Sequence, residues 1–394
     1  MEGACPNTWT TAYASYHADV MAGRLPPRYL VHTCDAGFAD CAVGAVTALY
    51  LAVLSRRALC IGRHTPQHFF RPGEPSAHLD AVFEQPSINW TMDDARWHSH
   101  TVSKSFQMGG MELQSDKVSS FLDDGACGDN STEVFFLNSN AGLVHKLVDH
   151  PRYAAKLSAM GSTIDNALGC GLDFLFAPKA AVLARVQPQM NELRQQAANA
   201  CHLPILAVHL RTGDADNFER RSHSDVPRDI SGPTDCIENI RSHIDSVRAK
   251  HVQPGGLCEA VATNKSRLFI ISDNVQVRRA LKHRYPDATI KMDTKPEHSF
   301  RQADNITLAG LELAAGEFWL FRMADYHIIT IRSGFGRAAA VAGPSQHPDW
   351  RPGHLLDRAS ATEKRAWQHS DWAKGCGKDD ALTQDDMVSI PPGV

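Results

Sequence analysis

A run of apolar residues at positions 205–210 leads into side chains that could bind a phosphate. His209 lies near the end of the run, and Arg211 and Asp214 follow it. The run has the composition of a buried strand, and open α/β sheets bind their ligands beyond the carboxyl ends of the strands. A guanidinium stays charged and can donate two hydrogen bonds to one phosphate, so Arg211 is a candidate ligand for a diphosphate. The alternative is a structural salt bridge from Arg211 to Asp214 or Asp216.

A second cluster follows the apolar run at positions 326–331. Ser333, Gly334 and Phe335 stand at the start of an alanine-rich segment that we expect to be helical. The start of a helix offers free backbone N–H groups and the positive end of the helix dipole, and Ser333 adds a hydroxyl. This segment is therefore a candidate phosphate-binding turn. The alternative is an ordinary turn between a strand and a helix that happens to use glycines.

Two carboxylates lie in or near apolar segments. Asp273 follows the apolar run at positions 269–271. It is placed either to accept a hydrogen bond from a ribose, a base or a neighbouring loop, or to cap the helix that we expect from Val275. Glu317 lies among apolar residues with helical spacing. An acid in that position pairs with a basic neighbour, accepts the N–H groups of a guanine, or lies on the polar face of the helix.

A further cluster lies in a loop that follows an apolar run at positions 29–34. The loop holds Asp35, Gly37, Phe38 and Asp40, and a long apolar segment comes after it. It lacks the Gly-x-Gly-x-x-Gly fingerprint of dinucleotide-binding folds and has no P-loop. We expect this loop to face a cleft and to help shape the site of a sugar or an acceptor.

Alternating strands and helices are expected to position these clusters. Such alternation is typical of doubly wound parallel sheets, so we expect an α/β fold with two Rossmann-like domains facing a cleft. The expected strands are residues 29–34, 58–62, 134–137, 205–210, 267–271, 288–292 and 326–331, and the expected helices are residues 41–55, 234–250, 275–285, 306–323 and 335–342. Residues 141–198 have a helical composition, with a kink or boundary at Pro188.

The composition excludes several classes of function. Among 394 residues, 40 Lys and Arg stand against 44 Asp and Glu, whereas nucleic-acid-binding proteins carry a basic excess. No run approaches the roughly 18–20 apolar residues of a membrane span, and the first residues lack the features of a signal peptide. The ten cysteines include no Cys-x-x-Cys pair, which argues against a zinc cluster.

Other features fit a secretory compartment. Four Asn-X-Ser/Thr sequons occur, at Asn89, Asn130, Asn264 and Asn305. Cysteines can pair as disulfides where the compartment is oxidising. We therefore expect the protein in the Golgi or another part of the secretory-pathway lumen.

Taken in order, these motifs resemble those of the fucosyltransferase superfamily, which includes α1,2-, α1,6- and protein O-fucosyltransferases. The resemblance rests on His209-Leu210-Arg211-Thr212-Gly213-Asp214, then Ser272-Asp273-Asn274, then the segment from Glu317 through Ser333. The last segment is particularly similar to the plant cell-wall type. The resemblance implies a GT-B-like fold and inverting transfer of fucose from GDP-fucose to a glycan or protein hydroxyl. It also implies that no cofactor or metal is needed, because arginine and helix-end amides stabilise the leaving diphosphate.

Carried over position by position, the resemblance implies that Arg211 holds the β-phosphate, His209 braces the nucleotide and Glu317 reads guanine. The other donor-binding positions are Gly213, Asp214, Asp273, Ser333, Gly334 and Phe335, of which the last three close around the pyrophosphate. For the general base, Glu219 stands eight residues after Arg211, where the α1,6 type places a carboxylate. Asp216 and Asp40 are the alternative bases.

The N-terminal loop departs from the family's Gly-Leu-Gly/Ala-Asn-Arg-Leu opening. Asp40 and Cys41 stand where the Asn-Arg pair is expected, so the contacts on the acceptor side are expected to differ. Two alternatives therefore stay open: the same fold with a different nucleotide-sugar donor, or a non-catalytic relative that binds a nucleotide or glycan. The expected domains are an acceptor-side domain at 1–200 with a loop-rich insertion, a donor domain at 201–345 and an extension at 346–394.

Overall fold

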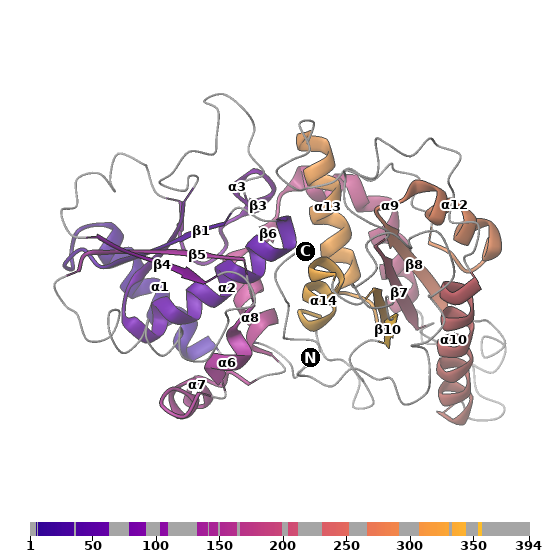
Figure 1. Cartoon of the computed structure of the whole chain (residues 1–394), viewed down its shortest axis with the longest axis horizontal. Helices are drawn as coiled ribbons and strands as arrows, with labels where there is room; N and C mark the ends of the chain where they lie inside the picture. Colours follow the sequence, from indigo (N-terminus) through magenta and orange to yellow (C-terminus); the bar gives the residue numbers. More distant parts are fainter. Residues whose placement is uncertain are drawn as a thin grey trace, which may run out of the picture. The chain divides into compact units, whose positions relative to one another are not determined.

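The chain folds into two compact units, each built on a parallel sheet (Figure 1). Unit 1 comprises Met1–Ala181, Ser299–Leu311 and Val388–Val394, and unit 2 comprises Val182–His298 and Glu312–Met387. This computed structural model describes residues 5, 7–34, 37–62, 79–91, 103–108, 132–140, 142–148, 150–163, 166–198, 204–211, 231–251, 266–290, 307–330, 333–343 and 354–356. The expected domain boundary at 200/201 lies outside the described residues.

The sheet of unit 1 has the strand order β2-β1-β5-β4, with every pairing parallel. Its strands are β1 (Tyr29–Thr33), β2 (Ala58–Ile61), β4 (Ser103–Met108) and β5 (Val134–Ser139). Leu30 on the central strand pairs with Leu59 on one side and Phe135 on the other. All five residues of β1 are buried, as expected for a strand covered on both faces.

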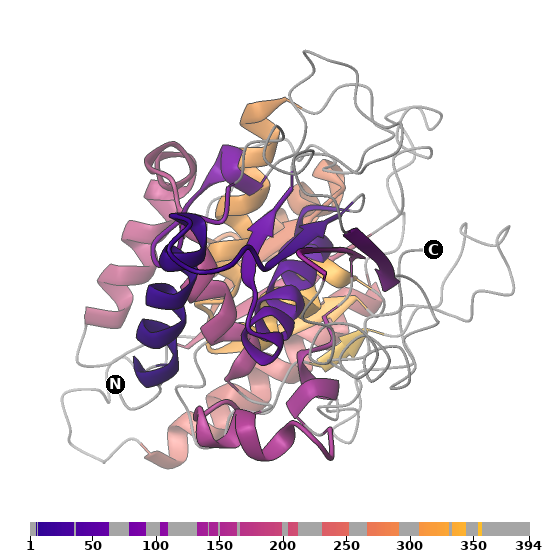
Figure 2. The ribbon, with the colours of Figure 1, turned by 90° about the vertical axis from the view of Figure 1, so that its left-hand side faces the viewer.

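Helices pack on both faces of this sheet (Figure 2). Val20 of α1 packs with Tyr29 and Val31, whereas the neighbouring His32 faces Gly44 of α2. Because successive strand residues point to opposite faces, α1 and α2 cover opposite sides of β1. The helices of unit 1 are α1 (Asn7–Met21), α2 (Phe38–Ser55), α3 (Leu79–Val82), α6 (Val144–Val148), α7 (Ala154–Ala159) and α8 (Ala167–Leu175), and β3 (Phe83–Glu84) pairs antiparallel with β6 (Ala177–Pro178).

Helix α2 is the core helix of unit 1. Every residue of α2 except Asp40 and Val53 is buried. Among the described helices, α2 is long and apolar enough to cross a membrane by length and composition, but 83% of that window is buried inside the protein. Burial against the sheet accounts for the apolar composition of α2.

Helix α1 was not anticipated from the sequence. Its buried residues are Trp9, Tyr13, His17 and Val20, which recur at helical spacing and form one face. The Tyr13 hydroxyl donates to the carbonyl of Arg57 and accepts from the amide of Leu59, both at 3.0 Å. These bonds attach α1 to the start of β2.

The sheet of unit 2 has the strand order β10-β9-β7-β8, again with every pairing parallel. Its strands are β7 (Ile205–Leu210), β8 (Arg267–Ser272), β9 (Tyr326–Thr330) and β10 (His354–Leu356). The helices are α9 (Ala180–Ala198), α10 (Ser231–His251), α12 (Val275–Arg284), α13 (Leu308–Phe321) and α14 (Gly334–Val341). The α/β fold class expected from the sequence is confirmed.

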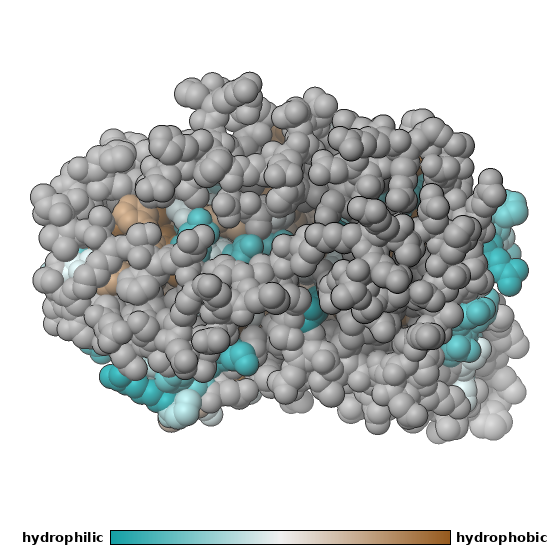
Figure 3. Space-filling view, viewed as in Figure 1, coloured by the Kyte–Doolittle hydropathy of each residue, from teal (hydrophilic) through white to brown (hydrophobic). Residues whose placement is uncertain are grey.

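Helices α10 and α12 of unit 2 each pack one apolar face against the sheet. Val277 and Leu281 of α12 join Ile237 and Ile244 of α10 in a core cluster with the sheet. The surface over α10 and α12, at the right of Figure 3, is hydrophilic. This division between faces is what an amphipathic helix on a sheet requires.

The structure adds detail to three sequence expectations. Thr289 forms only an isolated bridge to Leu268 where a strand was expected at 288–292, and residues beyond 290 are not described. Helix α9 continues through Pro188, so of the two alternatives there the helix boundary is excluded. The extension expected at 346–394 contributes strand β10 to the sheet of unit 2.

Candidate functional site

The ends of three adjacent strands bring the expected site residues of unit 2 to one edge of its sheet. Strand β7 lies between β8 and β9, and His209 pairs with Ile271 on one side and Ile329 on the other. Since all three strands are parallel, the residues that follow them emerge at the same edge. Arg211 and Asp273 directly follow the ends of β7 and β8, and Ser333 lies just beyond β9.

Thr330, the last residue of β9, connects two of these strand ends. Its hydroxyl donates to the carbonyl of His209 at 3.1 Å and accepts the amide of Arg211 at 3.0 Å. Its carbonyl accepts the amide of Ser333, also at 3.0 Å. The backbones of Arg211 and Ser333 are therefore held to the same residue. Thr330 could not be recognised from the sequence, because nothing in the sequence shows that its hydroxyl faces β7.

The start of α14 offers backbone amides at this edge. Ser333 is the N-cap of α14, and its buried hydroxyl accepts the amide of Gly336 at 3.5 Å. The first N–H groups of a helix have no carbonyl partner within the helix and attract anions. A Cβ atom on Gly336 would lie 3.0 Å from both Cγ and Nδ1 of His209, so the glycine permits α14 to approach β7 closely.

His209 is a buried, neutral group in this arrangement. Its ring stacks on Phe335, with centroids 5.3 Å apart, and meets the edge of Phe321. Burial, together with the positive charges of Arg211 and Arg278, lowers the pKa of His209 to about 3. At neutral pH the imidazole is uncharged, so it contacts its neighbours through packing and does not attract phosphate as a cation.

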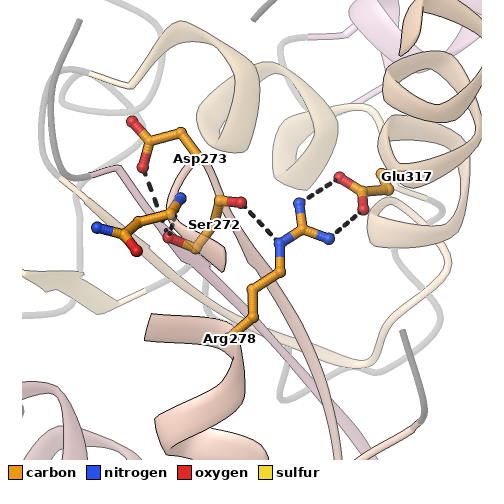
Figure 4. A network of polar contacts seen from close by, with 5 residues as sticks. Ser272, Asp273, Arg278 and Glu317 are labelled. Atoms are coloured by element: carbon orange, nitrogen blue, oxygen red, sulfur yellow. Dashed lines mark hydrogen bonds and ion pairs between the residues drawn. The ribbon is translucent and has the colours of Figure 1, made fainter. Parts of the chain in front are cut away.

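Glu317 pairs with a basic neighbour, one of the alternatives raised by the sequence. Its two carboxylate oxygens accept from the two terminal nitrogens of Arg278, at 2.5 and 2.9 Å (Figure 4). The Arg278 Nε donates to the carbonyl of Ser272 at 2.7 Å. Both side chains are buried, with about 5% of each exposed. Glu317 was recognised from the sequence but Arg278, which is 39 residues away along the chain, was not.

Asn274, and not Asp273, caps helix α12. The Asn274 side chain accepts from the amides of Gln276 at 2.9 Å and Val277 at 3.3 Å. The Asp273 carboxylate lies 3.5 Å from the Ser272 hydroxyl and is partly exposed (Figure 4). The capping role considered for Asp273 is thus filled by its neighbour, while a hydrogen bond from a ribose, a base or a neighbouring loop stays a prediction.

The chain is similar in fold to a solved structure. No family profile and no curated protein sequence matches the chain. A variant of FUT1 from Arabidopsis thaliana, in complex with GDP, aligns with a TM-score of 0.58 at 13% identity, covering 90% of this chain and 79% of that one.

The chain has the fold of a fucosyltransferase.

Two further fucosyltransferases align more loosely. NodZ, an α-1,6-fucosyltransferase from Bradyrhizobium co-crystallised with GDP, has 14% identity and a TM-score of 0.48, and the match covers 81% of this chain and 94% of that one. POFUT1 in complex with GDP-fucose has 10% identity and a TM-score of 0.39, covering 84% of this chain and 98% of that one. At these scores neither adds to the argument for the fold.

In unit 1 of this fucosyltransferase fold, a disulfide closes the N-terminal loop. Cys34, after β1, bonds to Cys41 in the first turn of α2. Phe38 is 2% exposed and packs on Phe83, so it is a core residue of unit 1. Gly37 is the N-cap of α2, and Asp40 lies partly exposed in the first turn.

Several expected site residues lie outside the part of the chain that the structure describes. They are Asp35, Gly213, Asp214, Asp216 and Glu219. The general base therefore stays a prediction, as does the salt bridge considered between Arg211 and its acidic neighbours. Among the described residues, no three His, Cys, Asp or Glu side chains gather in a way that could hold a metal ion.

Proposed function

We propose that the protein is a glycosyltransferase that transfers fucose from GDP-fucose to a hydroxyl of a glycan or protein. The observation that carries the proposal is the link from Arg211 through Thr330 to Ser333, which joins a guanidinium-bearing strand end to a helix start. A diphosphate needs such a combination of charge and directed N–H groups. The likeness in fold to a GDP-bound fucosyltransferase supports the same class of ligand.

The proposed reaction is an inverting displacement that needs no metal. The acceptor oxygen forms a bond to the anomeric carbon on the face opposite GDP, while the bond from that carbon to the β-phosphate oxygen breaks. Arg211 and the amides at the start of α14 stabilise the negative charge that develops on the leaving diphosphate. A carboxylate accepts the proton of the acceptor hydroxyl; Glu219 is the first candidate, with Asp216 and Asp40 as alternatives.

The remaining donor contacts follow from the same placement. His209, neutral and stacked on Phe335, provides an apolar surface beside the nucleotide. Gly213 and Asp214 complete the motif that His209 begins, and Gly334 contributes an amide to the diphosphate. We propose that Asp273 contacts the ribose or the base.

A thermal-shift and GDP-release panel over several sugar nucleotides tests the proposal. We expect GDP and GDP-fucose to raise the melting temperature, and GDP to be released from GDP-fucose when an acceptor is present. Release from another sugar nucleotide, with none from GDP-fucose, would indicate a different donor. The absence of stabilisation by any guanine nucleotide would contradict the proposal.

A second candidate function is a non-catalytic relative that binds a nucleotide or glycan. The Cys34–Cys41 disulfide is the observation that favours this second function. The disulfide lies in the loop where the fucosyltransferase superfamily has an Asn-Arg pair. The same panel separates the two: stabilisation by GDP without GDP release, over a broad set of acceptors, indicates binding alone.

We also propose that the protein functions in the secretory lumen, most consistently the Golgi. Disulfides Cys5–Cys170 and Cys34–Cys41 fit an oxidising compartment. Asn89 of the sequon Asn89-Trp90-Thr91 is exposed, so a glycan attached there would extend into solvent. Secretion from eukaryotic cells should yield a glycan at Asn89 that Asn89→Gln removes. An unmodified Asn89 together with reduced cysteines in the purified protein would contradict this compartment.

A further inference from the structure

Arg278 uses all of its nitrogen atoms to connect three elements of unit 2. It projects from α12, its Nε donates to the carbonyl of Ser272 at the end of β8, and its terminal nitrogens donate to Glu317 of α13 (Figure 4). A lysine has one point charge and no planar fork, so it cannot make this set of bonds. The geometry of the contact therefore depends on a guanidinium.

Stability alone gives little reason for this ion pair. Burying two charges carries a desolvation penalty, and well-packed apolar residues of similar size often stabilise a fold as well or better. A second Arg–Glu pair, Arg185 with Glu312, joins α9 to α13 but leaves 48% of the arginine side chain exposed. The buried pair differs from the Arg185–Glu312 pair because it holds the end of β8 in place.

The turn that Arg278 holds carries polar groups to the candidate donor site. Ser272 accepts Nε of Arg278 through its carbonyl, and its hydroxyl accepts the amide of Asn274 at 3.1 Å. Asp273 lies between these two residues. The guanidinium of Arg278 is also close enough to His209 to lower the pKa of that ring. Arg278 therefore borders the same strand ends as Arg211.

We propose that Arg278, paired with Glu317, is a positioning residue for donor binding: it anchors the 272–274 turn to α13 and so sets the position of Asp273. This inference rests on the proposed function, since the donor is the ligand whose affinity it controls. On this account Glu317 acts through Arg278 and does not contact the base. The pair fixes the backbone of the turn through the bond from Arg278 to the Ser272 carbonyl, and the proposal assigns the donor contact to Asp273.

The test compares two changes to the buried pair with a matched change to the exposed one. The variants are Arg278→Lys, the double variant Arg278→Leu with Glu317→Leu, and the control Arg185→Lys, which alters an Arg–Glu pair on the same helix α13. For each, the melting temperature, the dissociation constant for GDP and the amide hydrogen exchange of residues 272–275 are measured in the full chain. The double variant leaves no unpaired buried charge, so it is expected to fold.

We expect both Arg278 variants to bind GDP at least about tenfold more weakly and to exchange faster at 272–275, whereas Arg185→Lys matches the wild type. If either folded Arg278 variant binds GDP as the wild type does, the positioning role is wrong. Unchanged exchange at 272–275 in both variants overturns it as well. Failure of the wild type to bind GDP would contradict the proposed function instead, and the exchange measurement would still decide whether Arg278 holds the turn.

Discussion

The hydroxyl of Thr330 accepts the amide of Arg211 at 3.0 Å, so the end of β9 is fastened to the end of β7. The same hydroxyl donates to the carbonyl of His209. The Thr330 side chain therefore fixes the backbone from which the Arg211 guanidinium projects. The Ser333 amide donates to the Thr330 carbonyl, so Thr330 also fixes the start of α14.

Thr330→Val should weaken GDP binding, because it removes both hydroxyl bonds while keeping the size and branching of the side chain. We expect a stability loss of about 1–3 kcal/mol, since the amide of Arg211 loses its acceptor. Urea denaturation and GDP titration measure the two effects. Thr330→Ser, which keeps the hydroxyl, should recover most of both, and equal behaviour of the Val and Ser variants would show that the hydroxyl has no role.

Gly336→Ala should push α14 away from His209. The added Cβ would stand 3.0 Å from two atoms of a buried ring that is stacked on Phe335. Overpacking of this kind costs about 1–3 kcal/mol, and the start of α14 would shift relative to Arg211. Thermal unfolding and GDP affinity should both decrease. Wild-type values for both would mean that this close approach is not required.

Stability should decrease in acid, because three buried histidines are held neutral. Burial lowers the pKa of His32 and His327 to about 4 and, with the charges of Arg211 and Arg278, that of His209 to about 3. The unfolded chain binds these protons more tightly, at a pKa near the ordinary 6.5. The stabilisation is therefore complete above about pH 6.5 and is lost as the pH falls toward about 4 and below.

Urea unfolding across this pH range checks that the free energy of unfolding falls as the pH falls. His32→Asn should flatten the dependence, because His32 donates through Nε2 to the carbonyl of Ser139 at 2.7 Å and is fully buried. His283→Asn, at an exposed position on α12, is the control and should leave the dependence unchanged. Stability that rises on acidification from about pH 7 would contradict the prediction.

The two disulfides within the described residues of unit 1 should contribute unequally to stability. Cys5–Cys170 closes a loop with a sequence separation of 165, whereas Cys34–Cys41 spans only 7. In the chain-entropy account the longer loop stabilises more, so replacing Cys5 and Cys170 by serine should cost about 2–5 kcal/mol. The corresponding pair of changes at Cys34 and Cys41 should cost less. Chemical denaturation of both variants measures the difference, and a larger loss at Cys34–Cys41 would point to strong local packing around that loop.

The strands of unit 2 that border the site followed from the sequence, whereas helix α1 was missed. Strand β7 and the ends of β8 and β9 were assigned within a residue, because each is an apolar run that ends at a polar residue. Those ends determine which edge of the sheet carries polar groups. Arg211, Asp273 and Ser333 were therefore named correctly as residues at one edge, while their contacts with a ligand stay predictions.

The pairings within the site could not be obtained in this way. Arg278 meets Glu317 only through the packing of α12 against α13, and Thr330 meets Arg211 only through the register of β7 and β9. No local sequence pattern indicates either contact, because the two partners lie far apart along the chain. The same limit applies to Cys5 and Cys170, since a list of ten cysteines does not specify partners.

A structure of the full chain bound to GDP tests the central claim most directly. The account predicts that the diphosphate lies between the Arg211 guanidinium and the first amides of α14, within hydrogen-bond distance of both, with His209 behind it. A diphosphate that contacts neither Arg211 nor the start of α14 would contradict the account.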